Sequence, residues 1–381
     1  MEDPFSLRPS GLYIDLDAMR QNIAFLRSRT SGSRFMAVVK ANAYGHGLLS
    51  SARVAIDAGA DYLGVAFVEE GIRLRQAGIK APILVFGGIF ETQVRYFLEH
   101  NLELTVSSID KLKSVEAVAK ASGVRARIHL KIDTGMERVG VHYYSAGRFL
   151  DEAMKVRFCD VVGVFSHLAL ADEDEAFTRV QIGRFSEIRS YLAGRISGNT
   201  MFHLANSAGV LSFPDSHFDM VRPGLAIYGV SPAENLLGTD YLTPVLQLKS
   251  RVVYFKVVKK GAGVSYGHRW IAPADTRVVT IPVGYGDGLP RRLSPGGQVL
   301  IRERKYPIVG VVCMDQLMAD IGPDGEAYVG DEVVLIGRQG AEAITVQDVA
   351  RIDGTITYEV LTSLNQRLPR RYTGGSAVQL E

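Results

Sequence analysis

The chain has 381 residues, of which 47% are hydrophobic and 22% charged, and its formal net charge is only +2. This composition is typical of a globular protein with a large buried core, and the length exceeds what one compact domain usually holds. The short basic clusters are scattered along the chain rather than gathered into a stripe, so we expect no nucleic-acid partner.

The cysteines, the histidines and the apolar runs exclude further classes. Cys159 and Cys313 have no paired spacing, so neither a disulfide framework nor a zinc site is predicted. The eight histidines form no ligand motif, and we expect no bound metal. No apolar run reaches membrane-spanning length, and residues 1–10 do not resemble a signal peptide. We therefore expect a cytoplasmic protein without a membrane partner.

From Arg34 onward, short β-rich runs alternate with longer segments of helical period, a pattern typical of βα units around a parallel sheet. The predicted strands are 35–39, 62–67, 83–86, 102–106, 126–132, 161–165, 201–204 and 219–221. The predicted helices are 48–58, 68–77, 91–100, 109–121, 145–155 and 175–192. Eight strands with helical crossovers predict a (β/α)8 barrel of the TIM type.

The pattern changes after about residue 240. Strand-like segments separated by Gly, Pro and Asp turns follow, at 246–258, 277–283, 298–301, 306–312, 318–321 and 332–336. A further strand-like segment at 11–16 can belong to either domain. The predicted fold is thus α/β, with the barrel in residues 1–240 and a mainly β C-terminal domain in residues 241–381.

Lys40 directly follows the first predicted barrel strand. The carboxyl ends of the strands form the mouth at which such barrels place their active sites. Burial there favours the neutral amine, which can form a Schiff base. The alternative is a lysine whose ammonium group extends to solvent from the strand end, and position alone does not decide between the two.

Other polar residues follow later barrel strands, and they are Asp133, His167, Asn206, Ser207 and Arg222. Taken singly, Ser207 can be a helix N-cap, Arg222 can form a surface ion pair and His167 can be an ordinary loop histidine. The loops after the last two strands are small and contain glycine, and barrels commonly hold a phosphate there. Together with Lys40, they indicate an aldehyde-bearing phosphate cofactor or a phosphorylated carbonyl substrate.

The segment AVVKANAYGHG at 37–47 resembles the cofactor-lysine signature of alanine racemases, and the resemblance extends over nearly the whole chain. Further matching motifs occur in the same order: KIDTGMER (131–138), HLANS (203–207), VRPG (221–224), SYG (265–267), GYGDG (284–288), CMD (313–315) and TYE (357–359). The resemblance implies an amino-acid racemase of fold type III that depends on pyridoxal phosphate and forms a homodimer with shared active sites.

The resemblance also implies a role for each matching residue. Lys40 would hold the cofactor covalently and act as the base on one face of the substrate α-carbon, and Tyr266, supplied across the dimer interface, would be the base on the other face. The expected phosphate ligands are Tyr44, Ser207, Gly224, Leu225 and Tyr358. The residues expected around the cofactor ring and the substrate are His167 and Arg222 at the pyridine, Arg138 and Met314 at the substrate carboxylate, and Tyr285 at the entrance. Lys131 matches a position that is carbamylated in some relatives, where it orients Arg138.

These roles are chemically coherent. The Arg222 guanidinium can only donate hydrogen bonds, so a pyridine nitrogen facing it stays largely unprotonated, which we expect to limit side reactions such as transamination. Two bases on opposite faces suit racemisation, because one removes the α-proton while the other delivers one. Free lysine and tyrosine titrate near pH 10, so the site must lower both pKa values. Taken alone, Tyr266 can equally be a core or interface tyrosine.

Some sequence features leave alternatives open. His167 precedes an apolar Leu-Ala-Leu segment, and Glu137 stands beside Arg138 where a small residue is commoner. An amino-acid decarboxylase would use a cysteine such as Cys313, a cofactor carrier would need only the barrel, and a class I aldolase would use Lys40 on a phosphorylated sugar. The resemblance favours alanine as substrate, with D-alanine supplied to peptidoglycan. Serine or a broader substrate range stays open.

Overall fold

The computed structural model describes residues 7–30, 32–233 and 236–374. They divide into two compact units, which we call the barrel unit and the β unit. The barrel unit contains residues 19–43 and 48–243, and the β unit contains the described residues up to 18, residues 44–47 and those from 244 onward. The assignment of residues 1–240 to the barrel differs from this division. The segment before residue 19 groups with the β unit because its strand pairs there.

The barrel unit is built on a closed ring of eight parallel strands. They are β2 (Arg34–Val38), β3 (Tyr62–Val65), β4 (Ile83–Val85), β5 (Glu103–Val106), β6 (Ala126–Asp133), β8 (Cys159–Phe165), β9 (Met201–His203) and β10 (Met220–Val221). Each strand pairs with the next, and the pairing of β10 with β2 closes the ring. A short strand, β7 (Val141–His142), pairs with β6 outside the ring. The predicted (β/α)8 barrel is therefore confirmed.

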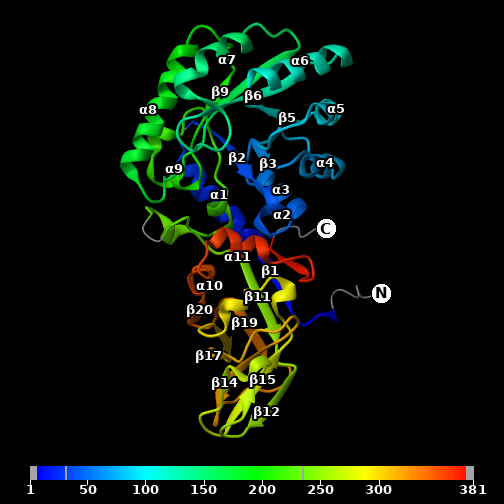
Figure 1. The fold of residues 1–381 in the computed structure, drawn as a ribbon, viewed down its shortest axis with the longest axis vertical. Coiled ribbons are helices and arrows are strands. Elements are labelled where there is room, and N and C mark those ends of the chain that lie inside the picture. Colours follow the sequence, from blue (N-terminus) through cyan, green and yellow to red (C-terminus); the bar gives the residue numbers. More distant parts are fainter. Residues whose placement is uncertain (1–6, 31, 234–235, 375–381) are drawn as a thin grey trace. The chain divides into compact units, whose positions relative to one another are not determined.

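Helices surround the barrel strands (Figure 1). The six predicted helices are present as α3 (Leu48–Asp57), α4 (Val68–Gln76), α5 (Glu91–Glu99), α6 (Ile109–Ser122), α7 (Ala146–Ala153) and α8 (Glu175–Leu192). Three helical segments were not predicted: α1 (Leu16–Ser28), the short turn α2 (Lys40–Tyr44) and α9 (Ser207–Ser212). Within the described part of the chain, none of the helices has the length and apolarity needed to span a membrane.

The interior of the barrel has an apolar part and a polar part. An apolar cluster fills one part with Met36, Tyr62, Leu84, Met201 and Met220. Inward-facing side chains of β5, β6 and β9 and of the residue after β10 also include buried polar groups, which are Glu103, His129, Lys131, His203 and Arg222. Because parallel barrels normally fill their interior with branched apolar residues, this polar part is the first structural sign of a site.

The β unit is organised around a ten-stranded sheet. Along its main path the strands are β12 (Tyr254–Val258), β15 (Thr276–Ile281), β18 (Leu317–Gly322), β17 (Arg304–Val309), β16 (Gln298–Ile301), β19 (Glu332–Gln339), β11 (Leu246–Arg251), β1 (Gly11–Asp15) and β21 (Arg370–Thr373), and β20 (Glu342–Ile344) pairs with β19. The mainly β prediction is confirmed. The predicted strand 246–258 is two strands, because Val252 and Val253 donate to different partners, Asp331 and Thr280.

The β unit also contains two helices that the sequence analysis did not predict, α10 (Val346–Asp353) and α11 (Thr357–Ser363). Thr345 caps α10, since its hydroxyl accepts from Asp348 N while the Asp348 carboxylate accepts from Thr345 N.

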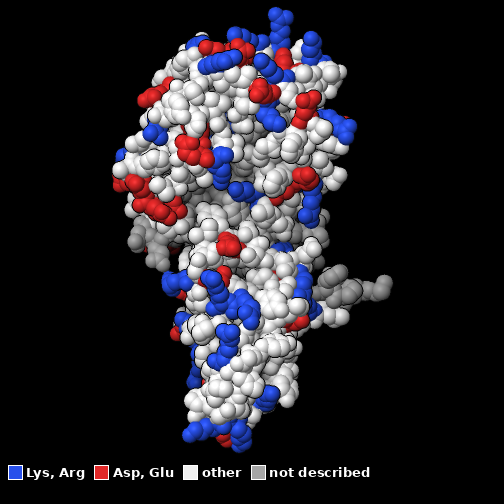
Figure 2. Space-filling model, in the orientation of Figure 1, with Lys and Arg blue, Asp and Glu red and all other residues white. Residues whose placement is uncertain are grey.

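Acidic and basic side chains are interspersed over the described residues on the face of the barrel unit in Figure 2.

Candidate active site

Lys40 stands at the start of a left-handed turn. Ala41, Asn42 and Ala43 all have φ near +53°, a conformation that costs an L-residue about 1–2 kcal/mol. The turn is held by Ala41 N, which donates to Glu70 Oε1 at 2.6 Å, and by Asn42 Oδ1, which accepts from Leu48 N at 2.9 Å. Strained backbone of this kind collects at functional sites, where surrounding bonds enforce it.

The electrostatic surroundings favour the neutral form of Lys40. Burial, followed by the positive charges of Arg138 and Arg222, lowers the pKa of the Lys40 amine, and Glu70 partly opposes this shift. A lysine at a barrel mouth with a lowered pKa can act as a nucleophile or a base. The solvent-extended alternative for Lys40 does not match this half-buried position.

Arg222 is buried inside the barrel, with 4% of its surface exposed. Its Nη2 donates to Ser166 O at 2.7 Å and Leu204 O at 3.1 Å, and its Nη1 lies 3.0 Å from His203 Nδ1. A surface ion pair is therefore the wrong explanation for this residue. Burial lowers the pKa of Arg222 to about 9, so the guanidinium stays protonated at neutral pH. It is a fixed positive charge that can only donate.

His167 lies beside Arg222, with its Nδ1 3.4 Å from Arg222 Nη2. Burial and then the charge of Arg222 hold the pKa of His167 well below its ordinary value. The imidazole is therefore neutral at physiological pH, and its flat apolar face is available to a ring. The ordinary-loop alternative does not explain this position against a buried guanidinium.

Lys131 is a second buried amine, 8% exposed, on β6. Its Nζ donates to Ile132 O at 3.2 Å and lies 4.9 Å from the centre of the Phe165 ring. Burial, then Arg222, lowers the pKa of Lys131 to about 7, with Asp133 opposing and Arg138 adding to the shift. The amine therefore lies in a field set by two guanidiniums, which favours a neutral or negative group at this position.

Asp133 shapes the loop that carries Arg138. Its Oδ1 accepts from Gly135 N at 2.8 Å and Met136 N at 2.9 Å, and its Oδ2 accepts from Arg138 N at 3.2 Å. One carboxylate thus holds three backbone amides of the segment between β6 and β7. The Arg138 side chain is exposed, so it can meet an anion arriving from solvent.

Ser207 connects the loops that follow β9 and β10 by hydrogen bonds. Its Oγ accepts from Gly224 N at 2.9 Å and Ala226 N at 3.2 Å. The residue that caps α9 is Asn206, whose side chain accepts from Gly209 N, so the N-cap alternative for Ser207 is wrong. Two accepted bonds use both lone pairs of the Ser207 hydroxyl and leave its hydrogen for an acceptor such as a phosphate oxygen. Leu225 begins the 3₁₀ turn that follows Gly224.

The remaining predicted site residues belong to the β unit. Tyr44 and Tyr358 come together there, with ring centres 5.9 Å apart. Burial and the neighbouring Tyr358 raise the pKa of Tyr44 far above its ordinary value, so its phenol remains a hydrogen-bond donor.

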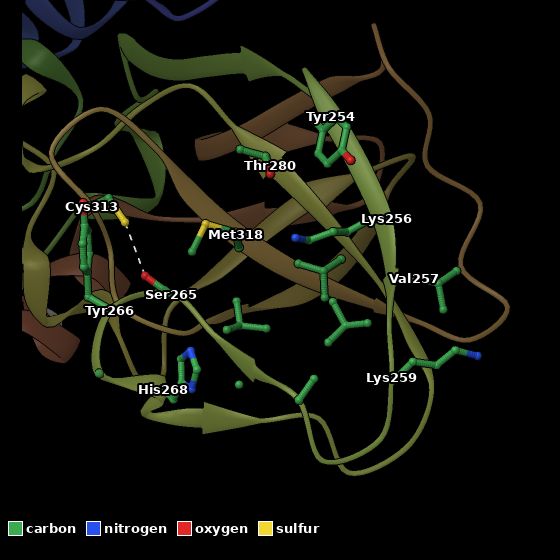
Figure 3. Close-up of a pocket in the computed structure, with 16 residues that line it drawn as sticks. Tyr254, Lys256, Val257, Lys259, Ser265, Tyr266, His268, Thr280, Cys313 and Met318 are labelled. Carbon is green, nitrogen blue, oxygen red and sulfur yellow. Dashed lines mark hydrogen bonds between the residues drawn. The ribbon is translucent and has the colours of Figure 1, made fainter.

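Tyr266 lies in a cavity of about 800 Å³ in the β unit, shown in Figure 3. It follows Ser265, whose Oγ donates to Val311 O at 2.8 Å and lies 3.3 Å from Cys313 Sγ. The Tyr266 side chain is 74% exposed on the single chain. A tyrosine this exposed is not a core residue.

The loop of Tyr285 is joined to the loop of Met314. Tyr285 N donates to Cys313 O at 3.1 Å, and Gly286 N donates to Met314 O at 2.8 Å. The side chains of Tyr285 and Met314 are 42% and 52% exposed. The structure therefore brings these two predicted residues together, with a large apolar surface open to solvent.

Family models account for both units. Residues 14–232 match the model described as the alanine racemase N-terminal domain, and residues 245–372 match the alanine racemase C-terminal domain. The chain belongs to the alanine racemase family. It is accordingly a racemase, an isomerase built on the barrel and β domain that the family shares.

Individual alanine racemases resemble the chain along its whole length. An alanine racemase of Symbiobacterium thermophilum is 44% identical over 97% of this chain and 99% of its own. The structure of alanine racemase from Streptomyces lavendulae is 38% identical, covers 98% of both chains and has a TM-score of 0.93. A histidine racemase of Leuconostoc mesenteroides is also similar, at 29% identity, 98% and 99% coverage and a TM-score of 0.87.

Sequence reasoning missed several residues that support the candidate site. Glu70 holds the turn after Lys40, and His203 holds Arg222. The Phe165 ring lies 5.4 Å from Arg222 Cζ and 4.9 Å from Lys131 Nζ, and it stacks on the neutral His203 ring at 5.0 Å. The available signal was position, because Phe165 and His203 end barrel strands that precede predicted site loops.

Proposed function

We propose that the chain interconverts L-alanine and D-alanine with pyridoxal phosphate as cofactor, and that Lys40 and Tyr266 are its two bases. The observation that carries the proposal is the buried cationic part of the barrel: a half-buried lysine of lowered pKa, a neutral histidine and an arginine without a carboxylate among its hydrogen-bond partners in the described residues. These groups suit a planar ring with a basic nitrogen.

The donor set of the barrel also suits the cofactor phosphate. The Ser207 hydroxyl has a hydrogen to give, and Gly224 and Leu225 provide backbone beside it. Tyr44 and Tyr358 would add phenolic donors. When bound, pyridoxal phosphate delocalises the negative charge that develops on the substrate α-carbon.

In this scheme each residue has one task. Lys40 would hold the cofactor and would exchange a proton with one face of the substrate α-carbon. Tyr266 exchanges a proton with the opposite face. Arg222 would donate to the ring nitrogen, and because the guanidinium stays charged it would leave that nitrogen unprotonated. Arg138 binds the substrate carboxylate together with the backbone of Met314, and Tyr285 narrows the entrance.

A homodimer follows from the same proposal, in which each subunit supplies Tyr266 and Met314 to the other. The exposure of Tyr266, Tyr285 and Met314 on the single chain supports this arrangement, because each side chain is open to contact from a second subunit. We infer that the D-alanine produced is used for peptidoglycan. Because a histidine racemase shares the fold, alanine as the preferred substrate is part of the proposal.

The substitution Tyr266→Phe tests the two-base scheme. We expect racemisation to fall by roughly 100-fold or more, the usual contribution of a general base. In heavy water, exchange of the α-proton should be lost for one enantiomer and retained for the other, because Lys40 still serves its own face. Tyr254→Phe is the matched control, since Tyr254 is exposed in the same cavity. Equal loss of exchange from both enantiomers would contradict the scheme.

A further inference from the structure

An unbroken line of hydrogen bonds crosses the interior of the barrel from β5 to the residue after β10. Glu103 Oε2 lies 2.7 Å from His129 Nε2, His129 Nδ1 lies 2.9 Å from His203 Nε2, and His203 Nδ1 lies 3.0 Å from Arg222 Nη1. The four residues are between 0% and 4% exposed. Side chains on different strands therefore form one connected buried network.

The two end residues, Arg222 and Glu103, determine which atom donates and which accepts in every hydrogen bond of this line. Arg222 can only donate, so His203 Nδ1 must carry a lone pair and His203 Nε2 must carry the hydrogen. His203 then donates to His129 Nδ1, which leaves the hydrogen of His129 on Nε2, facing Glu103. An ionised carboxylate can only accept, so both ends require the same two tautomers.

Charge supports this assignment at both ends. Burial alone would raise the pKa of Glu103, but bonds from His129 and from Arg127 Nε at 2.8 Å lower it overall, so the carboxylate is ionised. Burial and Arg222 hold the pKa of His203 well below its ordinary value, so this imidazole is neutral.

Gly163 on β8 leaves the space that the hydrogen bond between His129 and His203 needs. β8 lies between β6 and β9 in the barrel, so the His129 ring must reach across it to meet His203. A Cβ atom at Gly163 would lie 2.1 Å from His129 Nδ1, closer than any real contact. Phe165, two residues further on β8, stacks in parallel on the His203 ring at 5.0 Å. Strand β8 thus leaves space for the His129 ring at Gly163 and supports the His203 ring with Phe165.

We propose that Glu103 is a positioning residue for Arg222, acting through His129 and His203. Its carboxylate sets which nitrogen of each imidazole carries the hydrogen, so that Arg222 meets a lone pair and not an N–H group. Arg222 is then held by His203, Ser166 and Leu204, and in the described residues no partner takes the hydrogen on its Nε. This deepens the proposed function, on which it rests, because Arg222 is the donor to the cofactor ring.

Neutron diffraction from crystals of the cofactor-loaded enzyme in heavy water tests the bond directions directly. We expect a deuteron on Nε2 of His129 and of His203 and none on either Nδ1. A deuteron on Nδ1 of either residue overturns the proposal. This readout does not depend on turnover, so an inactive protein would refute the proposed function and leave the present test intact.

Variants test whether the bond direction matters for Arg222. Glu103→Leu removes the acceptor, and Gly163→Ala separates His129 from His203 without changing an ionisable group. We expect kcat to fall roughly tenfold or more in both, the usual size of a lost supporting bond, with KM little changed and with a shifted absorption maximum of the bound pyridoxal phosphate. Wild-type spectra and kinetics in folded Glu103→Leu would overturn the proposal.

Two further variants separate positioning from a general effect on folding. Glu103→Gln should recover most of the activity and the wild-type spectrum, because its amide oxygen can accept from His129 while the half-exposed Arg127 turns to water. Thr105→Val is the control, since Thr105 is buried on the same strand but bonds to Val85 O outside the line. A shifted spectrum in Thr105→Val equal to that in Glu103→Leu would refute a specific role for Glu103.

Discussion

Dissolved carbon dioxide should modify Lys131. Its pKa of about 7 makes roughly 90% of the amine neutral at pH 8, against about 0.3% for an ordinary lysine of pKa 10.5. The reactive form is therefore enriched about 300-fold. The neutral amine nitrogen would bond to the carbon of CO2 and release one proton, so that an uncharged amine becomes a carbamate anion. Arg138 and Arg222 would stabilise that anion, since both lower the pKa of the amine.

Carbon-13 NMR of the protein in labelled bicarbonate measures this modification. We expect one carbamate resonance that grows between pH 6 and pH 8 and is absent in Lys131→Met. That substitution keeps an unbranched four-atom stem, with sulfur in place of one methylene, and removes the amine. No protein-bound resonance at pH 8, or the same resonance in Lys131→Met, would refute the electrostatic reasoning.

The unmodified lysine should also make stability depend on pH. Its pKa is lower in the folded protein than in the unfolded chain, so between pH 7 and about pH 10.5 the unfolded chain binds more protons and stability rises with pH. Below pH 7 the buried amine is protonated, and it lowers the free energy of unfolding by its full amount, at most about 5 kcal/mol. In CO2-free buffer, Lys131→Met should therefore raise the free energy of unfolding by a few kcal/mol at pH 6, with a gain that shrinks toward pH 10. A gain that grows with pH would contradict this sign.

Two further predictions concern the β unit. Tyr44→Phe should weaken the binding of pyridoxal phosphate by roughly 10- to 100-fold, the cost of one hydrogen bond to a charged group, and an unchanged Kd in an absorbance titration would exclude Tyr44 as a ligand. Gly288→Ala should lower the free energy of unfolding in urea by about 3 kcal/mol or more, because φ is +92° and the new Cβ would lie 1.9 Å from Ser363 O. Its control, Gly183→Ala in α8, meets no atom within 4 Å and should stabilise by up to about 1 kcal/mol.

The barrel was predictable because each of its strands is a short apolar run between turns. Its eight strands and six outer helices lie within a few residues of their predicted positions. Helix α1 was missed although Met19, Ile23 and Leu26 have helical spacing and are fully buried. The sequence also offered a cap, since Asp15 directly precedes the helix. In the structure its Oδ1 accepts from Asp17 N and Ala18 N.

Long-range pairing was not predictable from the sequence. The segment 11–16 reads as a strand, but only the fold shows that β1 joins β11 and β21, more than 200 residues away. Glu103 was missed for a related reason. Because β5 is buried on both faces, its sequence does not indicate which way the Glu103 carboxylate points. The partners of Glu103, His129 and Arg127, come from another strand.

The strain beside Lys40 can be measured by making one substitution in two backbone environments. Ala41 is exposed and has φ +53°, whereas Ala117 is exposed within the right-handed helix α6. Glycine has no left-handed penalty, so Ala41→Gly should recover part of the 1–2 kcal/mol stored there, less the entropy that glycine loses, for a net gain of roughly 0.5 kcal/mol. Ala117→Gly should instead destabilise by about 1 kcal/mol.

Urea unfolding of both variants decides the matter, because neither substitution removes a buried contact or a charge. Opposite signs would show that the chain keeps alanine after Lys40 at a cost in stability. Glu70 enforces the turn by accepting from Ala41 N, and this bond is kept in Ala41→Gly. A loss of stability in Ala41→Gly as large as that in Ala117→Gly would show that the turn stores no strain, and that Lys40 is oriented by Glu70 and the barrel strand alone.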